Sequence, residues 1–320
     1  MAQTTDQKYR LVTRSDFDGL VCAALLRHLE LIDEIKFVHP KDMQDGKVEI
    51  SDSDITTNLP YVPGAHLAFD HHPSEELRID HAPDNWVMDA AALSTARVVY
   101  DHFGGSDRFP QFGEDIMSAV DQADAARFSE EEILKPEGWT LLSFLMDPRT
   151  GLGRFRDFRI SNYQLMMELI EACTRLSIEE ILELPDVAER VELYYEHEPQ
   201  AIKQIERCAT VHDKVVVLDL REEEVIHPTN RFMIYALFPS CTLSIHVIWG
   251  LKQQNTVLAV GKSIIDRSCP THVGELMLAH GGGGHAAAGT CQVDNDRAEA
   301  VLAEIVEHVR QRDRAGNVAV

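Results

Sequence analysis

The sequence feature that most constrains the fold is an apolar run at positions 67–69 that passes directly into Asp70, His71 and His72. Such a run predicts a buried strand that ends abruptly in a polar loop. A loop at the end of a strand holds its side chains in place on a rigid sheet. Neutral imidazole and carboxylate together suit a hard or borderline divalent ion. By itself an Asp-His-His tripeptide fits a solvated loop better than a metal site, so other motifs must decide between the two.

A second acidic motif lies near the start of the chain, where a strand over 9–13 and a helix over 20–32 flank Asp16, Phe17, Asp18 and Gly19. Two acids that are two positions apart at an extended strand end point roughly the same way, so both could ligate ions. The glycine allows the backbone to turn tightly into the helix. An acidic N-cap cluster explains the motif equally well.

Further acids follow the next predicted elements. Strands are expected over 35–38 and 48–51, and the second ends in Asp52 and Asp54. Helices are expected over 90–102 and 112–125, and the last turn of the second carries Asp121 and Asp124 on one face. A helix C-terminus is a poor place for two acids, which favours a functional interpretation. The alternation of strands, acidic loops and helices predicts a parallel sheet whose carboxyl ends gather the acids.

Taken together, these motifs resemble those of the DHH phosphoesterase superfamily, in particular its exopolyphosphatase-related proteins with a C-terminal DHHA1-type domain. The resemblance covers nearly the whole chain. It rests on five matches in family order: Asp16-Phe17-Asp18-Gly19, Asp54 (or Asp52), Asp70-His71-His72, Asp124 (or Asp121) and Gly282-Gly283-Gly284-His285. One departure is that many members place a histidine two or four residues before the first acid, where this chain has Arg14 and Val12. The occupancy of one of two metal positions is therefore open.

The resemblance implies roles for these residues. It makes metal ligands of Asp16, Asp18, Asp54, His71 and Asp124, with Asp52 and Asp121 as fallbacks. It makes His72 a phosphate contact or the proton donor to the leaving oxygen. It leaves Asp70 either a ligand or an orienting partner of the histidines. Two Mn²⁺ ions are expected, with Mg²⁺ as second choice because carboxylates alone suit Mg²⁺ and imidazole favours Mn²⁺.

The second half of the chain is expected to bind substrate. The fold class expected is α/β, with a parallel-sheet DHH domain over 1–135, a helical connector over 136–208 and a smaller C-terminal α/β domain over 209–320. Strands over 215–220, 232–238, 243–249 and 257–264 predict a mixed or antiparallel sheet in that last domain. Glycine-rich backbone allows close approach to an anion. The expected substrate contacts are Gly283, Gly284 and His285, followed by Lys262, Arg267 and Arg231.

A basic run over 149–159 contains four arginines in an acidic chain and matches phosphate geometry. A basic surface paired with neighbouring acids is the alternative, and it is slightly favoured.

Charge and cysteine content limit the partners. The chain has 30 Lys and Arg against 53 Asp and Glu, a net charge of -23, which argues against a continuous grip on duplex DNA. Six cysteines without a Cys-x-x-Cys pair predict reduced thiols in a cytoplasmic protein. The first ten residues are not followed by an apolar run of signal-peptide type, and the sequence predicts no membrane segment. Whether the chain forms a homodimer is open.

The function expected is therefore a metal-dependent phosphoesterase of a small anionic substrate, exopolyphosphatase-like, which acts on phosphoanhydride or phosphodiester bonds. The first alternative is a phosphodiesterase of oligoribonucleotides, phosphonucleotides or cyclic dinucleotides. Such an enzyme would use aromatic side chains for base stacking, and the aromatic fraction of 7% shows no evident platform. The alternative of another class is a nucleotide or polyphosphate sensor with weak catalysis, for which the missing histidine before Asp16 is the only support.

Overall fold

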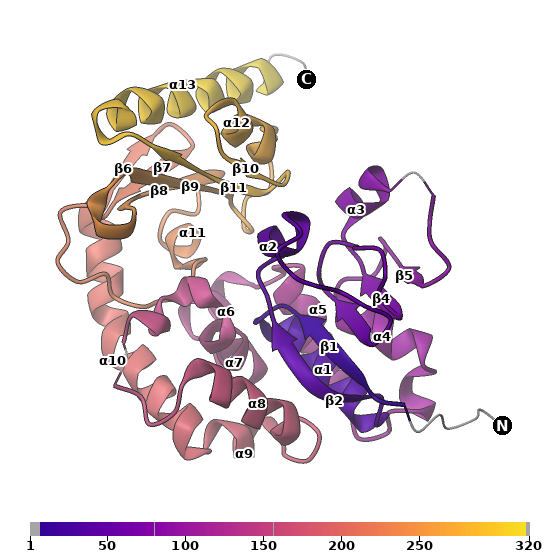
Figure 1. The fold of residues 1–320 in the computed structure, drawn as a ribbon. Coiled ribbons are helices and arrows are strands. Elements are labelled where there is room, and N and C mark those ends of the chain that lie inside the picture. The colour runs from indigo at the N-terminus through magenta and orange to yellow at the C-terminus, as the bar shows by residue number, and fades with distance from the viewer. Residues whose placement is uncertain (1–6, 80, 156, 318–320) are drawn as a thin grey trace. The chain divides into compact units, whose positions relative to one another are not determined.

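The computed structural model of the protein describes residues 7–79, 81–155 and 157–317 (Figure 1). The chain divides into two compact units. The first is Met1–Phe128 with Pro136–Leu193, and the second is Ser129–Lys135 with Tyr194–Val320. The three-part division expected at 135 and 208 stays a prediction. No helix within the described ranges is long and apolar enough to cross a membrane.

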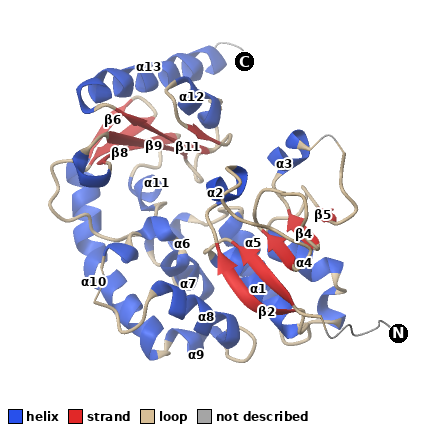
Figure 2. Ribbon diagram, viewed as in Figure 1, coloured by secondary structure: helices blue, strands red, loops and turns tan. Residues whose placement is uncertain are grey.

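The first unit is built on a 5-stranded sheet in the order β2-β1-β3-β4-β5, and each neighbouring pair is parallel (Figure 2). Its strands are β1 (Tyr9–Thr13), β2 (Ile32–Phe37), β3 (Asp54–Thr57), β4 (Leu67–Asp70) and β5 (Trp86–Met88). Because all strands run the same way, their carboxyl ends meet at one edge, where open sheets of this type bind ligands. The expected parallel sheet is confirmed.

Helices cover this sheet and extend the unit beyond it. The first helix after β1 is almost wholly buried, with Leu20, Leu25 and Leu26 at 0% exposure, so it forms the centre of the core. The helices after β1 are α1 (Phe17–His28), α2 (Pro40–Gln44), α3 (Pro73–Arg78), α4 (Thr95–His102), α5 (Glu114–Asp124), α7 (Gly138–Met146), α8 (Asn162–Ala172) and α9 (Ile178–Leu182). Helix α10 (Pro185–Cys208) begins in the first unit and ends in the second.

The strand expected over 48–51 does not form. Val48 and Ile50 instead lie in a loop, half-buried against a small cluster of Val12, Met43 and Leu59. Their alternation with polar residues reflects this packing of a loop onto the core rather than a sheet ladder. The strand begins later, at Asp54. This shift decides where the neighbouring acids lie.

The second unit contains a 6-stranded mixed sheet in the order β10-β11-β9-β8-β7-β6. Only β7 and β8 pair in parallel in this described sheet; the other neighbours are antiparallel. The strands are β6 (Ala209–His212), β7 (Val215–Asp219), β8 (Leu243–Trp249), β9 (Thr256–Lys262), β10 (Gly283–Gly284) and β11 (Ala288–Val293). One face packs on α12 (Val273–Ala279) and α13 (Ala298–Asn317) through a single apolar cluster. The expected mixed α/β architecture is confirmed.

The segment expected as a strand over 232–238 is a helix, α11 (Met233–Leu237). The side chain of Asn230 accepts a hydrogen bond from Phe232 N at 3.1 Å and starts the turn. Residues 233–236 are all buried, so their apolar run shows no period that separates strand from helix. A further helix of this unit, α6 (Glu130–Leu134), starts with a capping box between Ser129 and Glu132.

Candidate active site

The turn between β1 and α1 positions the first two acids. Asp16 is the N-cap of α1, and its Oδ1 accepts a hydrogen bond from Gly19 N at 3.0 Å. A Cβ at Gly19 would lie 2.1 Å from the backbone oxygen of Arg14, so only glycine fits this turn. The turn therefore holds both acids next to each other at the carboxyl edge of the sheet. The N-cap interpretation is confirmed for Asp16, whereas the interpretation of the two acids as metal ligands stays a prediction.

Asp18 is buried and is held by the N-terminus of α4. Its Oδ1 accepts from Ala96 N at 2.7 Å, and its Oδ2 accepts from Thr95 N at 3.1 Å. These backbone donors stabilise the ionised carboxylate at a helix N-terminus. Burial, together with the charges of Asp124 and Asp16, nevertheless raises the pKa of Asp18, although His71 and the Ala96 N–H oppose the rise. Asp18 therefore lies in a strongly negative environment that favours a cation.

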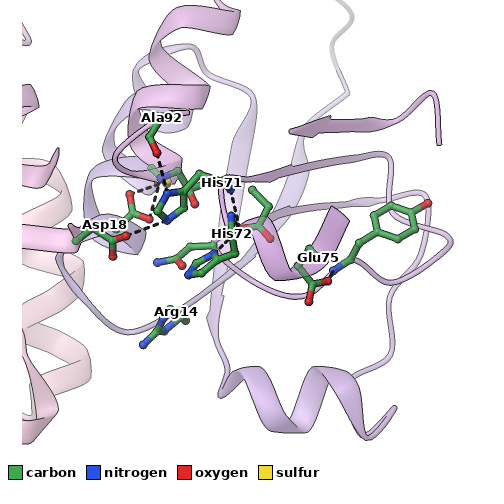
Figure 3. Close-up of polar contacts among 12 residues, drawn as sticks. Arg14, Asp18, His71, His72, Glu75 and Ala92 are labelled. Atoms are coloured by element: carbon green, nitrogen blue, oxygen red, sulfur yellow. Dashed lines mark hydrogen bonds and ion pairs between the residues drawn. The ribbon is translucent and has the colours of Figure 1, made fainter. Parts of the chain in front are cut away.

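His71 and Asp124 complete a group around Asp18. His71 Nδ1 lies 3.2 Å from the backbone oxygen of Ala92, and Nε2 lies 2.9 Å from Asp124 Oδ2 (Figure 3). With its Nδ1–H held by the carbonyl, the ring presents Nε2 to the acids, as a metal-binding histidine requires. Burial by itself would lower the pKa of His71, but the hydrogen bond to Asp124 and the charges of Asp18 and Asp124 raise it to about 9.

The donor set fits a divalent ion. One ligand atom from each of Asp18, His71 and Asp124 lies within 4.8 Å of the others, which is the spacing that a shared ion would need. The set combines two carboxylates with one imidazole, which suits Mn²⁺ better than Mg²⁺. Asp70 Oδ2 is also buried and has no hydrogen-bond partner among the described residues, so the region contains an unused acceptor oxygen.

His72 and Asp70 form a pair beside this group. His72 Nδ1 lies 2.7 Å from Asp70 Oδ1, and the same oxygen accepts from His71 N at 2.8 Å. Asp70 is 1% exposed, whereas the side chain of His72 is 39% exposed. Burial would lower the pKa of His72, but the hydrogen bond to Asp70 raises it. Of the two roles expected for Asp70, this geometry favours the orienting one.

Two predicted ligands lie elsewhere. Asp54 is the first residue of β3, at the amino end of the strand, where its Oδ1 and Oδ2 accept from Arg10 at 2.7 Å and 3.0 Å. Asp52 is exposed in the loop before it. In a parallel sheet the amino and carboxyl ends lie at opposite edges, so neither acid can join Asp18. The metal-ligand prediction for Asp54 and its fallback Asp52 is wrong because the strand begins six residues later than expected.

Asp121 and Asp124 make different contacts, and these favour Asp124 as the candidate ligand. Asp121 accepts from Ser94 Oγ at 2.7 Å and from Arg97 Nε at 2.9 Å. These bonds join α5 to the start of α4, whose backbone N–H groups hold Asp18. Asp121 therefore positions the site, and Asp124 lies in it.

Sequence reasoning missed Asn58, which follows β3 at the carboxyl edge. Its Nδ2 donates to Asp16 Oδ1 at 3.1 Å, and it is 1% exposed. Its φ of 54° lies in the left-handed region, where asparagine is among the residues most often found. The available signal was the β-branched run over 55–57 directly before Asn58, but the strand was expected over 48–51, too early to show it.

The predicted substrate contacts all lie in the second unit. A Cβ at Gly282 would lie 2.1 Å from Thr290 O, and one at Gly284 would lie 2.2 Å from Ala288 O. Packing therefore explains these two glycines, while a Cβ at Gly283 would meet nothing within 4 Å. His285 Nδ1 accepts from Ala287 N at 3.2 Å. Their role in substrate binding stays a prediction.

The other cations predicted there have local partners. Lys262 Nζ donates to Cys269 O at 3.1 Å, Arg267 Nε donates to Ile264 O at 3.1 Å, and the Arg231 guanidinium lies 4.2 Å from the Phe232 ring centre. These contacts restrain the side chains.

The basic run over 149–159 is partly paired with acids. Arg149 binds both carboxylate oxygens of Asp147 at 2.7 Å and 2.9 Å, and Arg159 binds Asp186. Arg156 lies outside the described residues. These two pairs agree with the alternative that this basic surface pairs with neighbouring acids.

Comparison with known proteins identifies relatives by structure. The chain is similar to a pGpG-specific phosphodiesterase from Vibrio cholerae, with 57% sequence identity, coverage of 95% of this chain and 100% of that one, and a TM-score of 0.84. The DHH domain of a protein described as a member of a ribosomal protein family shares the fold at 12% identity, with 95% and 87% coverage and a TM-score of 0.54. CDC45 from Entamoeba histolytica does so at 8% identity, with 95% and 96% coverage and a TM-score of 0.53. No protein-family model and no curated protein matches the chain.

Proposed function

Because the chain belongs to the DHH phosphoesterase superfamily, we propose that it is a divalent-ion-dependent phosphodiesterase whose preferred substrate is the linear dinucleotide pGpG. The observation that carries this proposal is the 57% identity, over 95% of this chain and all of the other, to a phosphodiesterase specific for pGpG. This similarity favours the dinucleotide alternative over the exopolyphosphatase-like activity that the sequence alone had placed first.

The metal centre in this proposal is formed by Asp18, His71 and Asp124. A divalent ion bound there supplies positive charge to the phosphoryl group and lowers the pKa of a water molecule. The backbone N–H groups of Thr95 and Ala96 fix the Asp18 carboxylate, and the Ala92 carbonyl fixes the His71 ring. These contacts hold the ligand atoms in place before an ion arrives, which limits the reorganisation that binding requires.

Proton transfer is assigned to His72. Hydrolysis adds a water oxygen to phosphorus and breaks the bond to a ribose oxygen, which must take up a proton as it leaves. Asp70 accepts from His72 Nδ1 and so leaves Nε2 for the substrate. The hydrogen bond to Asp70 raises the pKa of His72 against the effect of burial, which favours the protonated ring that this transfer uses. The arrangement is that of an imidazole oriented and charged by a buried carboxylate.

The proposal is tested by substrate choice. Purified protein with Mn²⁺ is assayed against pGpG, other linear dinucleotides, cyclic dinucleotides, pyrophosphate and polyphosphate. We expect the highest kcat/KM for pGpG and a lower rate with Mg²⁺ than with Mn²⁺. Preferential release of phosphate from polyphosphate would return the exopolyphosphatase-like prediction to first place.

Matched variants show whether the activity comes from this site. His71→Ala and Asp124→Asn should lose bound metal and turnover together, because each removes a ligand. His81→Ala, a histidine replacement at an exposed loop position, is the control and should retain both. Full activity in the two ligand variants would place the chemistry elsewhere in the molecule.

A further inference from the structure

The carboxylate of Asp16 is already occupied by donors from the protein. Its Oδ1 accepts from Gly19 N at 3.0 Å and from Asn58 Nδ2 at 3.1 Å. Its Oδ2 lies 3.0 Å from Arg14 Nε. An ion bound to Asp16 would therefore lie next to a guanidinium, whose positive charge repels it. Asp16 differs from Asp18 and Asp124 in having a guanidinium as partner, because Asp18 accepts from backbone N–H groups and Asp124 pairs with His71; only these two acids belong to the group of converging ligand atoms.

Asn58 strengthens this difference. The orientation of its amide is set by Asp16, because the opposite orientation would place the amide oxygen against a carboxylate oxygen. The residue is neutral, so it offers no charge with which to balance a second divalent ion next to Asp16. Compared with the two-ion centre that the family resemblance implies, this site has one acid fewer and one guanidinium more, so it is less suited to two divalent cations.

Arg14 is the cation at this position. Its side chain is 32% exposed, and Asp16 is its only acidic partner at ion-pair distance among the residues that the structure describes. Figure 3 shows Arg14 below His72 and Asp18 in the close-up of the site. The planar guanidinium has five N–H donors, so the contact to Asp16 leaves several for a phosphate.

We propose that the centre binds one divalent ion firmly, at Asp18, His71 and Asp124, and that Arg14, held by Asp16, supplies the second positive charge to the phosphodiester. This inference rests on the proposed function and deepens it, because it assigns a substrate contact to a residue that sequence reasoning treated only as a missing ligand. The two-ion centre expected from the family resemblance is replaced by an ion and an arginine. Asp16 and Asn58 are positioning residues for that arginine.

Metal stoichiometry tests the first half without any substrate. Metal-free protein is titrated with Mn²⁺, and bound ion is counted by equilibrium dialysis with elemental analysis. We expect about one tightly bound ion per chain in the wild type and none in His71→Ala. The double variant Arg14→His and Asn58→Asp adds two ligands and removes the guanidinium, so it should gain a second ion. Exchange-coupled Mn²⁺ pairs in the electron paramagnetic resonance spectrum of the wild type would overturn the proposal.

Kinetics of single Arg14 variants test the second half. Arg14→Met keeps much of the length of the side chain but removes its charge, and kcat/KM for pGpG should fall roughly 10- to 100-fold with Mn²⁺ content unchanged. Arg14→Lys should recover part of the loss by restoring the charge. Loss of the bound ion in Arg14→Met, or an unchanged kcat/KM, would refute the assignment. If the wild type itself does not cleave pGpG, the proposed function fails, while the ion count is still decided by the titration.

Discussion

Proton release on metal binding is the sharpest consequence of the site geometry. In the metal-free protein His71 carries a proton between its ring and Asp124, because its pKa is raised to about 9. An ion needs the lone pair of Nε2, so it must displace that proton. Since pH 7 is about two units below the pKa of the ring, the protein loses apparent affinity for the metal ion by a factor of roughly 100, or about 3 kcal/mol.

The assay is calorimetric titration of metal-free protein with Mn²⁺ at pH 7 in two buffers of different ionisation enthalpy. The difference in heat should give about one proton released per ion. Chelator competition between about pH 6.5 and 9.5 should show the apparent affinity rising with pH and levelling near 9. His81→Ala serves as the control and should follow the wild type. A flat pH profile with no buffer dependence would show that His71 is neutral before the ion binds.

The same shift predicts the opposite trend for the stability of the metal-free protein. The folded pKa of His71 lies above the unfolded value, so its contribution is fully present below about pH 6.5 and is lost as the pH rises to about 9. The pKa of Asp18 is also raised, so its ionisation lowers the stability of the folded protein, but over a lower pH range that begins near pH 4. The melting temperature of metal-free protein should therefore fall between about pH 6.5 and 9, and Mn²⁺ should weaken or reverse that fall.

Three more outcomes are expected. If its predicted phosphate contact is correct, His285→Ala should leave Mn²⁺ content unchanged and lower kcat/KM by a factor that corresponds to roughly 1.5–3 kcal/mol of lost transition-state stabilisation. Loss of metal would contradict a role confined to substrate. Gly19→Ala should destabilise the protein by about 3 kcal/mol in denaturant titration, because a Cβ there would lie 2.1 Å from Arg14 O; wild-type stability would mean that the turn can relax. Duplex DNA should bind weakly at physiological salt, since the net charge is -23, and tight binding with a steep salt dependence would refute this.

The sequence predicted those parts of the site that depend on local structure. Asp16, Asp18 and Gly19 form one turn, and Asp70, His71 and His72 follow one buried strand, so their local geometry follows from neighbouring residues alone. The parallel sheet follows from the alternation of such strands with helices. These were the elements of the fold and the site that could be predicted with a physical reason.

The errors came from contacts between segments far apart in the chain. Arg10 and Asp54 are 44 positions apart, and only the register of β1 with β3 brings them together. That pairing fixes Asp54 at the amino edge and leaves Asn58 at the carboxyl edge. A half-buried loop and an edge strand show the same alternation over residues 48–51, so the pattern could not locate where β3 begins.

Each acid of the centre has its own donor within the protein. Asp18 has two backbone N–H groups at the start of α4, Asp124 has His71, and Asp16 has Arg14 with an asparagine amide and a backbone N–H. Three close carboxylates would otherwise repel one another strongly in a buried site. Because the donors are built into the turn and the helix terminus, we expect the group to keep its arrangement without an ion, so that a bound metal would serve the proposed chemistry rather than folding. An ion at Asp18 and Asp124 then replaces only the proton of His71, while the charge of Asp16 stays balanced by the arginine.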